Sequence, residues 1–402
     1  MTHDLFDKFD NIITEYKKLA EGGDLNPFTV SMDAVISPTE AIINGKKTIL
    51  AGTNNYMGMT YNQECIMAAE DALRNFGTGT TGSRVLNGTY YGHKKLEETL
   101  KDFYDADHAI VFSTGYQANL GVISTVAGPK DYVVIDADSH ASIYDGCAMG
   151  NATVVRFAHN NPEDLEKRLA RIRRKDPDAG ILVVIEGVYS MLGDQAPIKE
   201  LATAAKKHDA FVLVDEAHSI GVFGKTGRGV AQEQNVEHLV DFTVGTFSKS
   251  VGTVGGYCVS NHPKFETLRL VCRPYVFTAS LPPSVVASAT KALELIKDSN
   301  LRVKLLENSM RLNKGLANAG FNMGTTGESP IAAIIIDDKQ TAIGYWQNMM
   351  KEGVYVNLAV PPATPNGLNL MRCSLSAAHS FVQIDYMLEK FIAVGKKLNV
   401  LS

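Results

Sequence analysis

The sequence has few cysteines, and none of them lies in a C-x-x-C pair. The five are scattered along the chain: Cys65, Cys147, Cys258, Cys272 and Cys373. Without paired spacing, the sequence predicts neither a zinc site nor a disulfide framework. An odd, scattered set is typical of proteins that work in a reducing compartment.

Long apolar runs are also missing. Apolar stretches such as residues 181–185 have the length of a strand, whereas a membrane-spanning helix needs about 20 apolar residues. Residues 1–8 lack the apolar core of a secretory signal peptide. These absences predict a cytoplasmic protein.

A strong charge of one sign is missing too, because 39 Lys and Arg stand against 44 Asp and Glu, a net charge of -5. This balance gives no reason to expect a nucleic-acid partner. No G-x-G-x-x-G motif follows the first strand of the region that alternates strands and helices. That absence disfavours a dinucleotide-dependent oxidoreductase.

What the chain does contain is an alternation of helices and short apolar strands between residues 93 and 214. Strands rich in Val and Ile, without polar alternation, indicate a parallel sheet covered on both faces. After Pro282-Pro283 the pattern changes to long helices with fewer strands. We therefore expect an α/β protein in three parts: an N-terminal helix with short strands (1–52), a large α/β domain (53–283) and a smaller C-terminal α+β domain (284–402).

Apolar residues recur at helical spacing near the N-terminus, which predicts an amphipathic helix. They are Leu5, Phe6, Phe9, Ile12, Ile13, Tyr16 and Leu19. We expect the apolar face to pack on the protein's own body or on a partner subunit. The alternative is docking on a lipid surface such as the inner membrane.

A lysine surrounded by small and hydroxylic residues lies in the segment Gly-Thr-Phe-Ser-Lys-Ser, residues 245–250. Burial disfavours the ammonium form and so lowers the pKa of a lysine. A neutral lysine can form a Schiff base with an aldehyde. Lys249 is therefore a candidate nucleophile, although the hexapeptide alone also fits a surface loop with a solvated lysine.

An acidic residue follows the apolar run 211–214 directly, as Asp215, with His218 three positions later. Ligands of open α/β sheets bind beyond the carboxyl ends of the strands. A carboxylate there is partly desolvated and needs a cationic partner. A protonated pyridine nitrogen is such a partner, and His218 could bond the phenolic oxygen of the same ring. A helix cap with a nearby salt bridge explains the pair equally well.

Two further segments lie at predicted strand ends. Gly115 and Tyr116 begin a helix, where backbone amides favour an anion such as a phosphate, although a plain helix cap has the same pattern. His140 could stack on a flat ligand or serve only the structure. Taken together, lysine, acid, histidines and amide-rich loops match the needs of pyridoxal 5'-phosphate: a nucleophile, a partner for the ring nitrogen and an anion clamp.

With these motifs the chain resembles the α-oxoamine synthases, pyridoxal-phosphate enzymes of fold type I, over nearly its whole length. The resemblance is densest in residues 55–58, 82–84, 215–219 and 246–249. Within that family the chain is most similar to the bacterial, soluble serine palmitoyltransferases, through residues 186–194, 245–256, 273–283 and 361–365. The resemblance implies an aspartate-aminotransferase-like architecture and a homodimer.

The resemblance also implies roles for single residues. Lys249 would carry the cofactor and move protons, Asp215 would pair with the pyridine nitrogen, and His140 would stack on the ring. His218 would contact the ring oxygen. The cofactor phosphate would be held by residues of both subunits: Gly115, Tyr116, Thr246 and Ser248 of one, and Thr278 and Ala279 of the other. The substrate contacts would be Asn55, Ser83 and Arg372.

The implied reaction is a decarboxylative condensation of L-serine with a long-chain acyl-CoA, such as palmitoyl-CoA. It gives 3-oxosphinganine, CoA and CO2, the first step of sphingolipid biosynthesis. The alternatives are a related synthase that uses glycine or alanine, namely glycine C-acetyltransferase or 8-amino-7-oxononanoate synthase, and a non-catalytic scaffold subunit. Asn54 and Val360 depart from the pattern we expect of the palmitoyltransferases. Both departures bear on acyl-chain preference and carboxylate handling.

Overall fold

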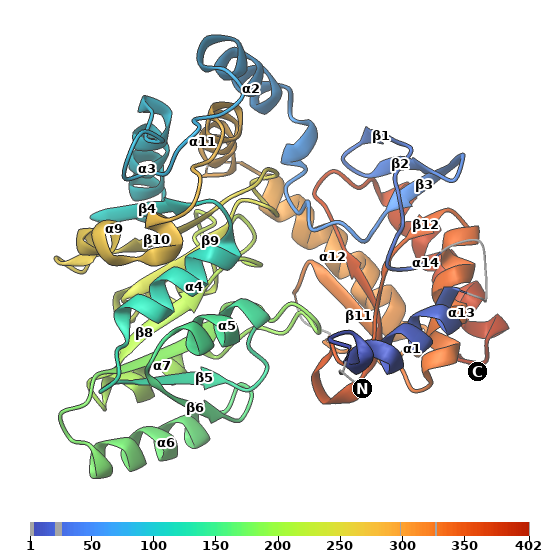
Figure 1. Cartoon of the computed structure of the whole chain (residues 1–402). Helices are drawn as coiled ribbons and strands as arrows, with labels where there is room; N and C mark the ends of the chain where they lie inside the picture. Colours follow the sequence, from blue (N-terminus) through green and yellow to red (C-terminus); the bar gives the residue numbers. More distant parts are fainter. Residues whose placement is uncertain (1–3, 21–25, 298, 326–327, 402) are drawn as a thin grey trace.

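The computed structural model describes residues 4–20, 26–297, 299–325 and 328–401. Two bodies lie side by side, one around a large sheet and one at the C-terminal end of the chain (Figure 1). The large sheet has seven strands in the order β4-β10-β9-β8-β7-β5-β6. The predicted fold type I architecture, a mostly parallel sheet with a smaller C-terminal domain, is confirmed.

The strands of the large sheet run parallel except β10, which is antiparallel to both of its neighbours. Their bounds are β4 (His108–Phe112), β5 (Tyr132–Asp136), β6 (Thr153–Phe157), β7 (Ile181–Glu186), β8 (Phe211–Asp215), β9 (Phe242–Thr246) and β10 (Gly256–Ser260). Because β5, β7, β8 and β9 are parallel, their carboxyl ends meet at one edge of the sheet. That edge carries Asp136, Glu186, Asp215 and Thr246.

Helices cover both faces of this sheet, which explains the unbroken apolar strands. On one face Val133 and Ile135 of β5 pack with Val122 and Ile143. On the other face the alternate residue Val134 packs in a separate core that includes helices α6 and α7. The helices of this body are α3 (Tyr91–Tyr104), α4 (Gly115–Val126), α5 (Ala141–Met149), α6 (Pro162–Lys175), α7 (Ile198–Lys206), α8 (Val230–Glu233), α9 (Leu268–Val271) and α10 (Arg273–Val276).

The second body contains two small sheets, β1-β2-β3-β12 and β11-β14-β13. The hairpin of β2 and β3 turns through Asn44 and Gly45, which both have positive φ, 49° and 72°, as a two-residue hairpin turn requires. β3 then pairs in parallel with β12, so the N-terminal strands join the C-terminal part of the chain. The strands are β1 (Ala34–Ser37), β2 (Glu40–Ile43), β3 (Lys46–Leu50), β11 (Ile331–Ile336), β12 (Val354–Tyr355), β13 (Asn357–Ala359) and β14 (Asn369–Ser374).

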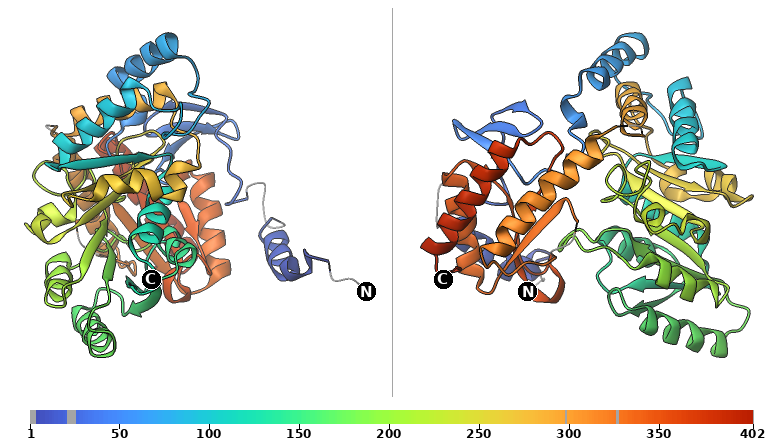
Figure 2. Two further views of the ribbon diagram at one scale, coloured as in Figure 1. Left: turned by 60° about the vertical axis from the view of Figure 1, so that its left-hand side comes forward. Right: turned by 180° about the vertical axis from the view of Figure 1, so that it is seen from behind.

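Long helices connect and flank the two bodies. α2 (Gln63–Phe76) packs with α11 (Pro283–Lys297), and α11 also packs on α3. Figure 2 shows α12 (Leu301–Asn318) leading from this group into the second body, where α13 (Lys339–Lys351) and α14 (Phe381–Lys397) lie. The short helices are η1 (Asp7–Phe9), η2 (Met59–Tyr61), η3 (Glu237–Leu239), η4 (Phe265–Thr267) and η5 (Pro365–Gly367).

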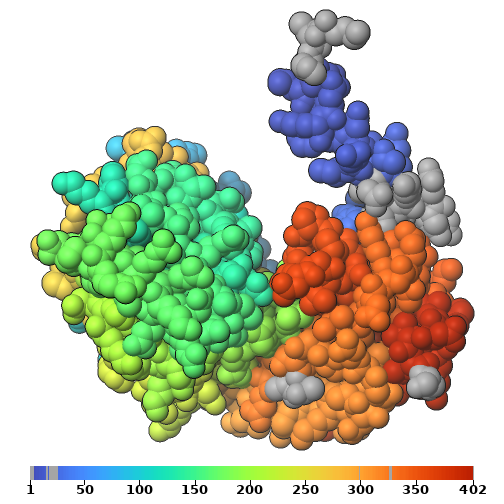
Figure 3. All heavy atoms as spheres, turned by 90° about the horizontal axis from the view of Figure 1, so that it is seen from below, coloured from blue at the N-terminus to red at the C-terminus, as the bar shows by residue number. Residues whose placement is uncertain are grey.

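The N-terminal segment forms η1 and then helix α1 (Asp10–Ala20). Its apolar side chains Leu5, Phe6, Phe9, Ile12 and Ile13 are exposed, and the segment projects away from both bodies (Figure 3). The side chains of Tyr16 and Leu19 lie outside the described part of the chain. The protein's own body therefore leaves the described apolar side chains uncovered. Across the described residues, every helix falls short of the length and apolarity that crossing a bilayer demands.

Candidate active site

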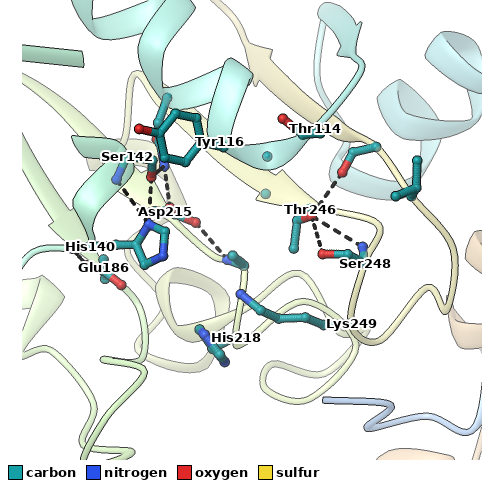
Figure 4. A pocket seen from close by; sticks show the side chains of 16 residues that line it. Thr114, Tyr116, His140, Ser142, Glu186, Asp215, His218, Thr246, Ser248 and Lys249 are labelled. Carbon is teal, nitrogen blue, oxygen red and sulfur yellow. Dashed lines mark hydrogen bonds between the residues drawn. The ribbon is translucent and has the colours of Figure 1, made fainter. Parts of the chain in front are cut away.

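A cavity of about 290 Å³ opens at the carboxyl edge of the large sheet. Figure 4 shows the side chains that surround it. Those lining it are Thr114, Gly115, Tyr116, Asn119, His140, Ser142, Glu186, Asp215, Ala217, His218, Gly245, Thr246, Ser248, Lys249, Val254 and Gly255. All of them belong to the large domain, and eight of the predicted site residues are among them.

Asp215, the last residue of β8, is buried on one side of the cavity. Its Oδ2 accepts a hydrogen bond from Asn119 Nδ2 at 2.7 Å, and its Oδ1 accepts one from Ala217 N at 2.9 Å. Both donors are neutral, and they fix the carboxylate without cancelling its charge. A buried carboxylate held in this way is suited to a cationic N–H of a ligand.

A second part of the cavity is built for an anion. Helix α4 begins at Gly115, and its first amides have no acceptor within the helix. Across from it lie the hydroxyls of Thr246 and Ser248, 2.9 Å apart. Thr246 packs so close to Gly115 that a Cβ there would lie 2.7 Å from Thr246 Cβ. Glycine therefore lets backbone amides and hydroxyls converge, which is the arrangement of a phosphate site.

Lys249 follows β9 by three residues and lies in the cavity between these two parts (Figure 4). Burial lowers the pKa of Lys249 to about 8, against the opposing effect of the Asp215 and Glu186 carboxylates, and the Arg372 guanidinium lowers it further. About a tenth of such amines are neutral at pH 7. The structure thus supplies a reactive amine beside an anion site and a carboxylate.

His218 is buried beneath the cavity, and its Nδ1 lies 2.7 Å from the hydroxyl of Tyr56. Burial, with the positive charges of Lys249, Arg372 and His140, holds the pKa of His218 well below its usual range. The ring is therefore neutral at pH 7. With Nδ1 bonded to Tyr56, its Nε2 is the nitrogen left to meet a ligand.

His140 is the N-cap residue of α5, and its Nδ1 lies 2.8 Å from Ser142 Oγ. Its backbone N–H donates to Glu186 Oε1 at 2.5 Å. Desolvation lowers the pKa of His140, and Lys249 adds to this, while Asp215 and Asp145 oppose it. The capping bond and the bond to Glu186 fix the ring beside the cavity, where a flat ligand can stack.

Arg372 lies on β14 in the second body and is buried, but it is not among the residues that line the cavity. Its Nε donates to the carbonyl of Ser190 at 2.6 Å, and its Nη1 donates to Ser374 Oγ at 2.8 Å. Both terminal nitrogens lie 3.3 Å from Asn54 Oδ1. Asn54, which departs from the pattern expected of the palmitoyltransferases, thus contacts Arg372, one of the predicted substrate contacts.

Asn55 also lies outside the cavity lining. Its Nδ2 donates to Thr60 Oγ1 at 2.7 Å, and its Oδ1 is buried without a hydrogen-bond partner. A buried carbonyl oxygen of this kind is a free acceptor. Asn55 therefore lies next to Tyr56, the hydrogen-bond partner of His218, with one buried polar atom still to be satisfied.

Ser83, Thr278 and Ala279 lie together on another side of α4, and none of them lines the cavity of their own chain. Ser113 Oγ donates to the carbonyl of Ala279 at 2.5 Å, and Gln117 Nε2 donates to Thr278 Oγ1 at 3.1 Å. The loop of Ser83 is tied to the same segment, because Ser280 N donates to the carbonyl of Gly82 at 3.0 Å. One chain alone does not bring these three residues to the site.

Eight of the residues that line the cavity were not predicted as site residues, and Asn119, Ser142 and Glu186 are among them. Glu186 had a signal in the sequence, since it directly follows the apolar run 181–185, as Asp215 follows the run 211–214; in the structure each acid is the last residue of its strand. Burial, with the Asp215 carboxylate, raises the pKa of Glu186 well above its usual range. Asn119 and Ser142, which are joined by a 3.0 Å hydrogen bond, look in the sequence like ordinary polar positions in helices.

These features fit pyridoxal 5'-phosphate. Asp215 offers a buried charge for the ring nitrogen, Lys249 an amine of lowered pKa for the aldehyde, and the α4 terminus with Thr246 and Ser248 a clamp for the phosphate. His140 and His218 both lie on the side of Lys249 toward which its amine points (Figure 4).

Comparison with known proteins agrees with this assignment. Residues 46–391 match the family "Aminotransferase class I and II". Serine palmitoyltransferase of Sphingomonas paucimobilis is 56% identical over 401 residues, which cover 99% of this chain and 95% of the relative. The structure of Sphingomonas wittichii serine palmitoyltransferase superimposes with a TM-score of 0.97, at 58% identity and full coverage of both chains.

Two further relatives bear on cofactor and substrate. A structure of serine palmitoyltransferase with its pyridoxal phosphate linked to the protein has a TM-score of 0.97 and 55% identity, and it covers 99% of this chain and 100% of its own. By contrast, 8-amino-7-oxononanoate synthase of Lysinibacillus sphaericus is 35% identical over 363 residues, 90% of this chain and 92% of the relative. The predicted family and cofactor are confirmed, and the palmitoyltransferases are the nearer of these two groups.

Proposed function

The chain belongs to the class I and II aminotransferase family of pyridoxal-phosphate enzymes, and we propose that it catalyses the serine palmitoyltransferase reaction. L-serine condenses with palmitoyl-CoA, and the products are 3-oxosphinganine, CoA and CO2. The observation that carries the proposal is the cavity in which Lys249, Asp215 and an anion clamp converge, in a chain 56% identical to such an enzyme. The reaction opens sphingolipid biosynthesis.

The bound cofactor supplies an electron sink for the carbanion that forms at the α-carbon of serine. Asp215 keeps the proton on the ring nitrogen, because a buried carboxylate favours a cation beside it. Asn119 and Ala217 hold that carboxylate in place. The amides of Gly115 and Tyr116 and the hydroxyls of Thr246 and Ser248 would hold the cofactor phosphate.

Proton movement falls to Lys249. Its amine takes the proton from the α-carbon of serine, and the lowered pKa lets it act as a base near neutral pH. His140 would stack on the ring of the cofactor and orient the serine carboxylate, while neutral His218 would donate to the ring oxygen through Nε2. Asn55, Ser83 and Arg372 contact the substrates, with Arg372 receiving the carboxylate.

The proposed substrates are tested by offering the purified enzyme serine, glycine and alanine, each with acetyl-CoA, pimeloyl-CoA and palmitoyl-CoA. We expect serine with palmitoyl-CoA to give a kcat/KM at least about tenfold above every other pair, because the chain is 56% identical to a serine palmitoyltransferase and 35% identical to an 8-amino-7-oxononanoate synthase. CoA release and product mass report the reaction. If glycine or alanine gave a kcat/KM equal to that of serine, the result would contradict the proposal and favour one of the related synthases.

We also propose a homodimer with shared active sites. Large apolar side chains near the loops of Ser83 and Thr278 are exposed on the single chain: Leu86 by 84%, Tyr91 by 78% and Phe277 by 74%. Apolar surface of this extent is typical of a subunit interface. A partner seated there would receive Thr278 and Ala279 at its own phosphate clamp.

We propose that the enzyme is cytoplasmic and that the apolar face of its N-terminal segment, residues 5–13, packs on the partner subunit. The alternative is that this face docks transiently on the inner membrane. Deleting residues 1–20 should raise the dimer dissociation constant in sedimentation velocity, because apolar area would be lost from the interface. The variant Ile12→Asp should do the same to a smaller degree. A deletion that leaves the dimer unchanged but abolishes co-sedimentation with phosphatidylglycerol vesicles would establish membrane docking instead.

A further inference from the structure

A charged cluster outside the cavity joins the carboxyl end of β5 to the loop that follows β7. His159 lies between two carboxylates: its Nδ1 is 2.8 Å from Asp136 Oδ1 and its Nε2 is 2.8 Å from Asp194 Oδ2. Asp138 Oδ2 lies 3.9 Å away. Neither His159 nor its three carboxylates line the cavity, and the mechanism above gives the cluster no task.

The geometry requires a doubly protonated ring. A carboxylate oxygen only accepts hydrogen bonds, so both ring nitrogens of His159 must donate. Burial alone lowers the pKa of His159, but the hydrogen bonds and charges of Asp136 and Asp194 outweigh it and raise the pKa to about 10. The edge contact with Tyr189, 4.5 Å between ring centroids, fixes the ring further.

One partner of His159, Asp194, lies in the 187–195 loop, which reaches from the large domain to the second body (Figure 1). The loop is closed by a bridge between Val188 and Gln195 and by a 2.9 Å bond from Tyr189 N to the carbonyl of Asp194. At its far side Gly193 is packed against Ser329 and Ile331, where a Cβ would lie 2.7 and 2.8 Å from their atoms. The loop is thus rigid and touches both bodies.

The same loop holds Arg372. The carbonyl of Ser190 accepts the 2.6 Å hydrogen bond from Arg372 Nε. Tyr189, which contacts His159, directly precedes Ser190. A short chain of contacts therefore runs from Asp136, fully buried at the end of β5, through His159 and the loop to the guanidinium on β14.

We propose that His159 is a positioning residue, whose imidazolium clamps the 187–195 loop to the large domain and so sets where Arg372 stands to receive the carboxylate of the amino-acid substrate. This rests on the proposed function, since it assigns the arginine a substrate to bind. Without the cation, Asp136 keeps its hydrogen bonds from the Asp138 and Asn160 amides, and Asp194 keeps one from Asn160 Nδ2, but the two negative charges lose the positive charge between them and repel each other. The loop then moves away from Asp136, and Ser190 with it.

The test compares His159→Gln and Asp194→Asn with His108→Gln. His108 is a matched control, because it is a half-buried histidine of the same sheet, paired to Glu266 at 3.3 Å, on a strand at the opposite edge. We expect the KM for serine to rise about tenfold in His159→Gln and less in Asp194→Asn, with the KM for palmitoyl-CoA and the cofactor affinity unchanged. His108→Gln should leave all three constants as they are.

Hydrogen–deuterium exchange of the cofactor-free protein supplies a readout that does not depend on the reaction. Peptides covering residues 187–195 should exchange faster in His159→Gln and Asp194→Asn, while peptides of β7 and β8 keep their protection, which also shows that the variants fold. Unchanged exchange in the loop would overturn the inference even if serine is the substrate. A rise in all the constants together would also overturn it, because that result indicates a general structural role. Faster exchange in the loop supports the clamp even if the substrate proves to be another amino acid.

Discussion

Replacing Lys249 with alanine is expected to lower kcat at least about 10³-fold, because the variant loses both the amine that holds the cofactor and the base for the α-proton. Lys249 is the one primary amine among the described residues that line the cavity. Its loss leaves Asp215 and the phosphate clamp intact, so the cofactor should still bind, but without a covalent link. Borohydride reduction followed by mass spectrometry should add the cofactor mass to the wild type and not to the variant.

The matched control for this prediction is Lys264→Ala, which removes an exposed lysine from the same domain. It should retain the yellow colour of the wild type, the covalent label and full turnover. A Lys249→Ala protein that keeps its label, or a wild type that stays colourless with added cofactor, would contradict the assignment. The colourless wild type would favour a non-catalytic scaffold subunit.

Asp215→Asn is expected to lower kcat by about 10²–10³-fold, the usual loss when one electrostatic contact of the transition state is removed. The amide keeps the shape of the carboxylate, but its single oxygen can accept from only one of the two donors, Asn119 or Ala217, so we expect some loss of stability with the fold preserved. Without the negative charge the ring nitrogen loses its proton, and the carbanion loses its sink. Steady-state kinetics at saturating cofactor and serine measure the change.

Asp241→Asn is the control for Asp215→Asn. Asp241 is a half-buried carboxylate just before β9, and it accepts a 2.6 Å hydrogen bond from Val212 N at the opposite edge of the same sheet. Its loss should cost stability but leave kcat within a factor of about two. If Asp215→Asn retained a kcat similar to that of this control, the ring nitrogen would have to be stabilised by another group.

The order of elements and the centre of the site were predictable because they follow from local patterns. Asp215 ends the strand β8 and Lys249 follows the strand β9 by three residues, and the rule that parallel strands end at one edge brings them together. Pairings between distant segments were not predictable. β12 is only two residues long. The sequence Val354-Tyr355 does not predict that this strand pairs with β3, which lies about 300 residues away in the chain.

Residues whose role is to position other residues could not be predicted from the sequence either. Asn119 is one of the polar residues of the mostly apolar helix α4. Its role becomes visible only in the structure, where its side chain bonds Asp215 at the end of β8. His159 lies after a strand with no motif around it, and its two carboxylates come from segments 23 and 35 residues away. The roles of Ser83, Thr278 and Ala279 remain proposals. The cavity that these residues would complete belongs to another copy of the chain.

Every residue lining the cavity lies between positions 114 and 255, whereas Asn55 and Arg372 come from segments before and after that span. The cofactor-binding residues, which must stay constant during evolution, are thus separate in the chain from the substrate-binding residues, which can vary. Substitutions along the boundary between the two bodies can change which amino acid and which acyl donor are accepted, while the lysine and its cofactor remain anchored to a single sheet. One such scaffold can therefore give rise to enzymes of different substrate choice, as the palmitoyltransferase and oxononanoate synthase relatives of this chain illustrate.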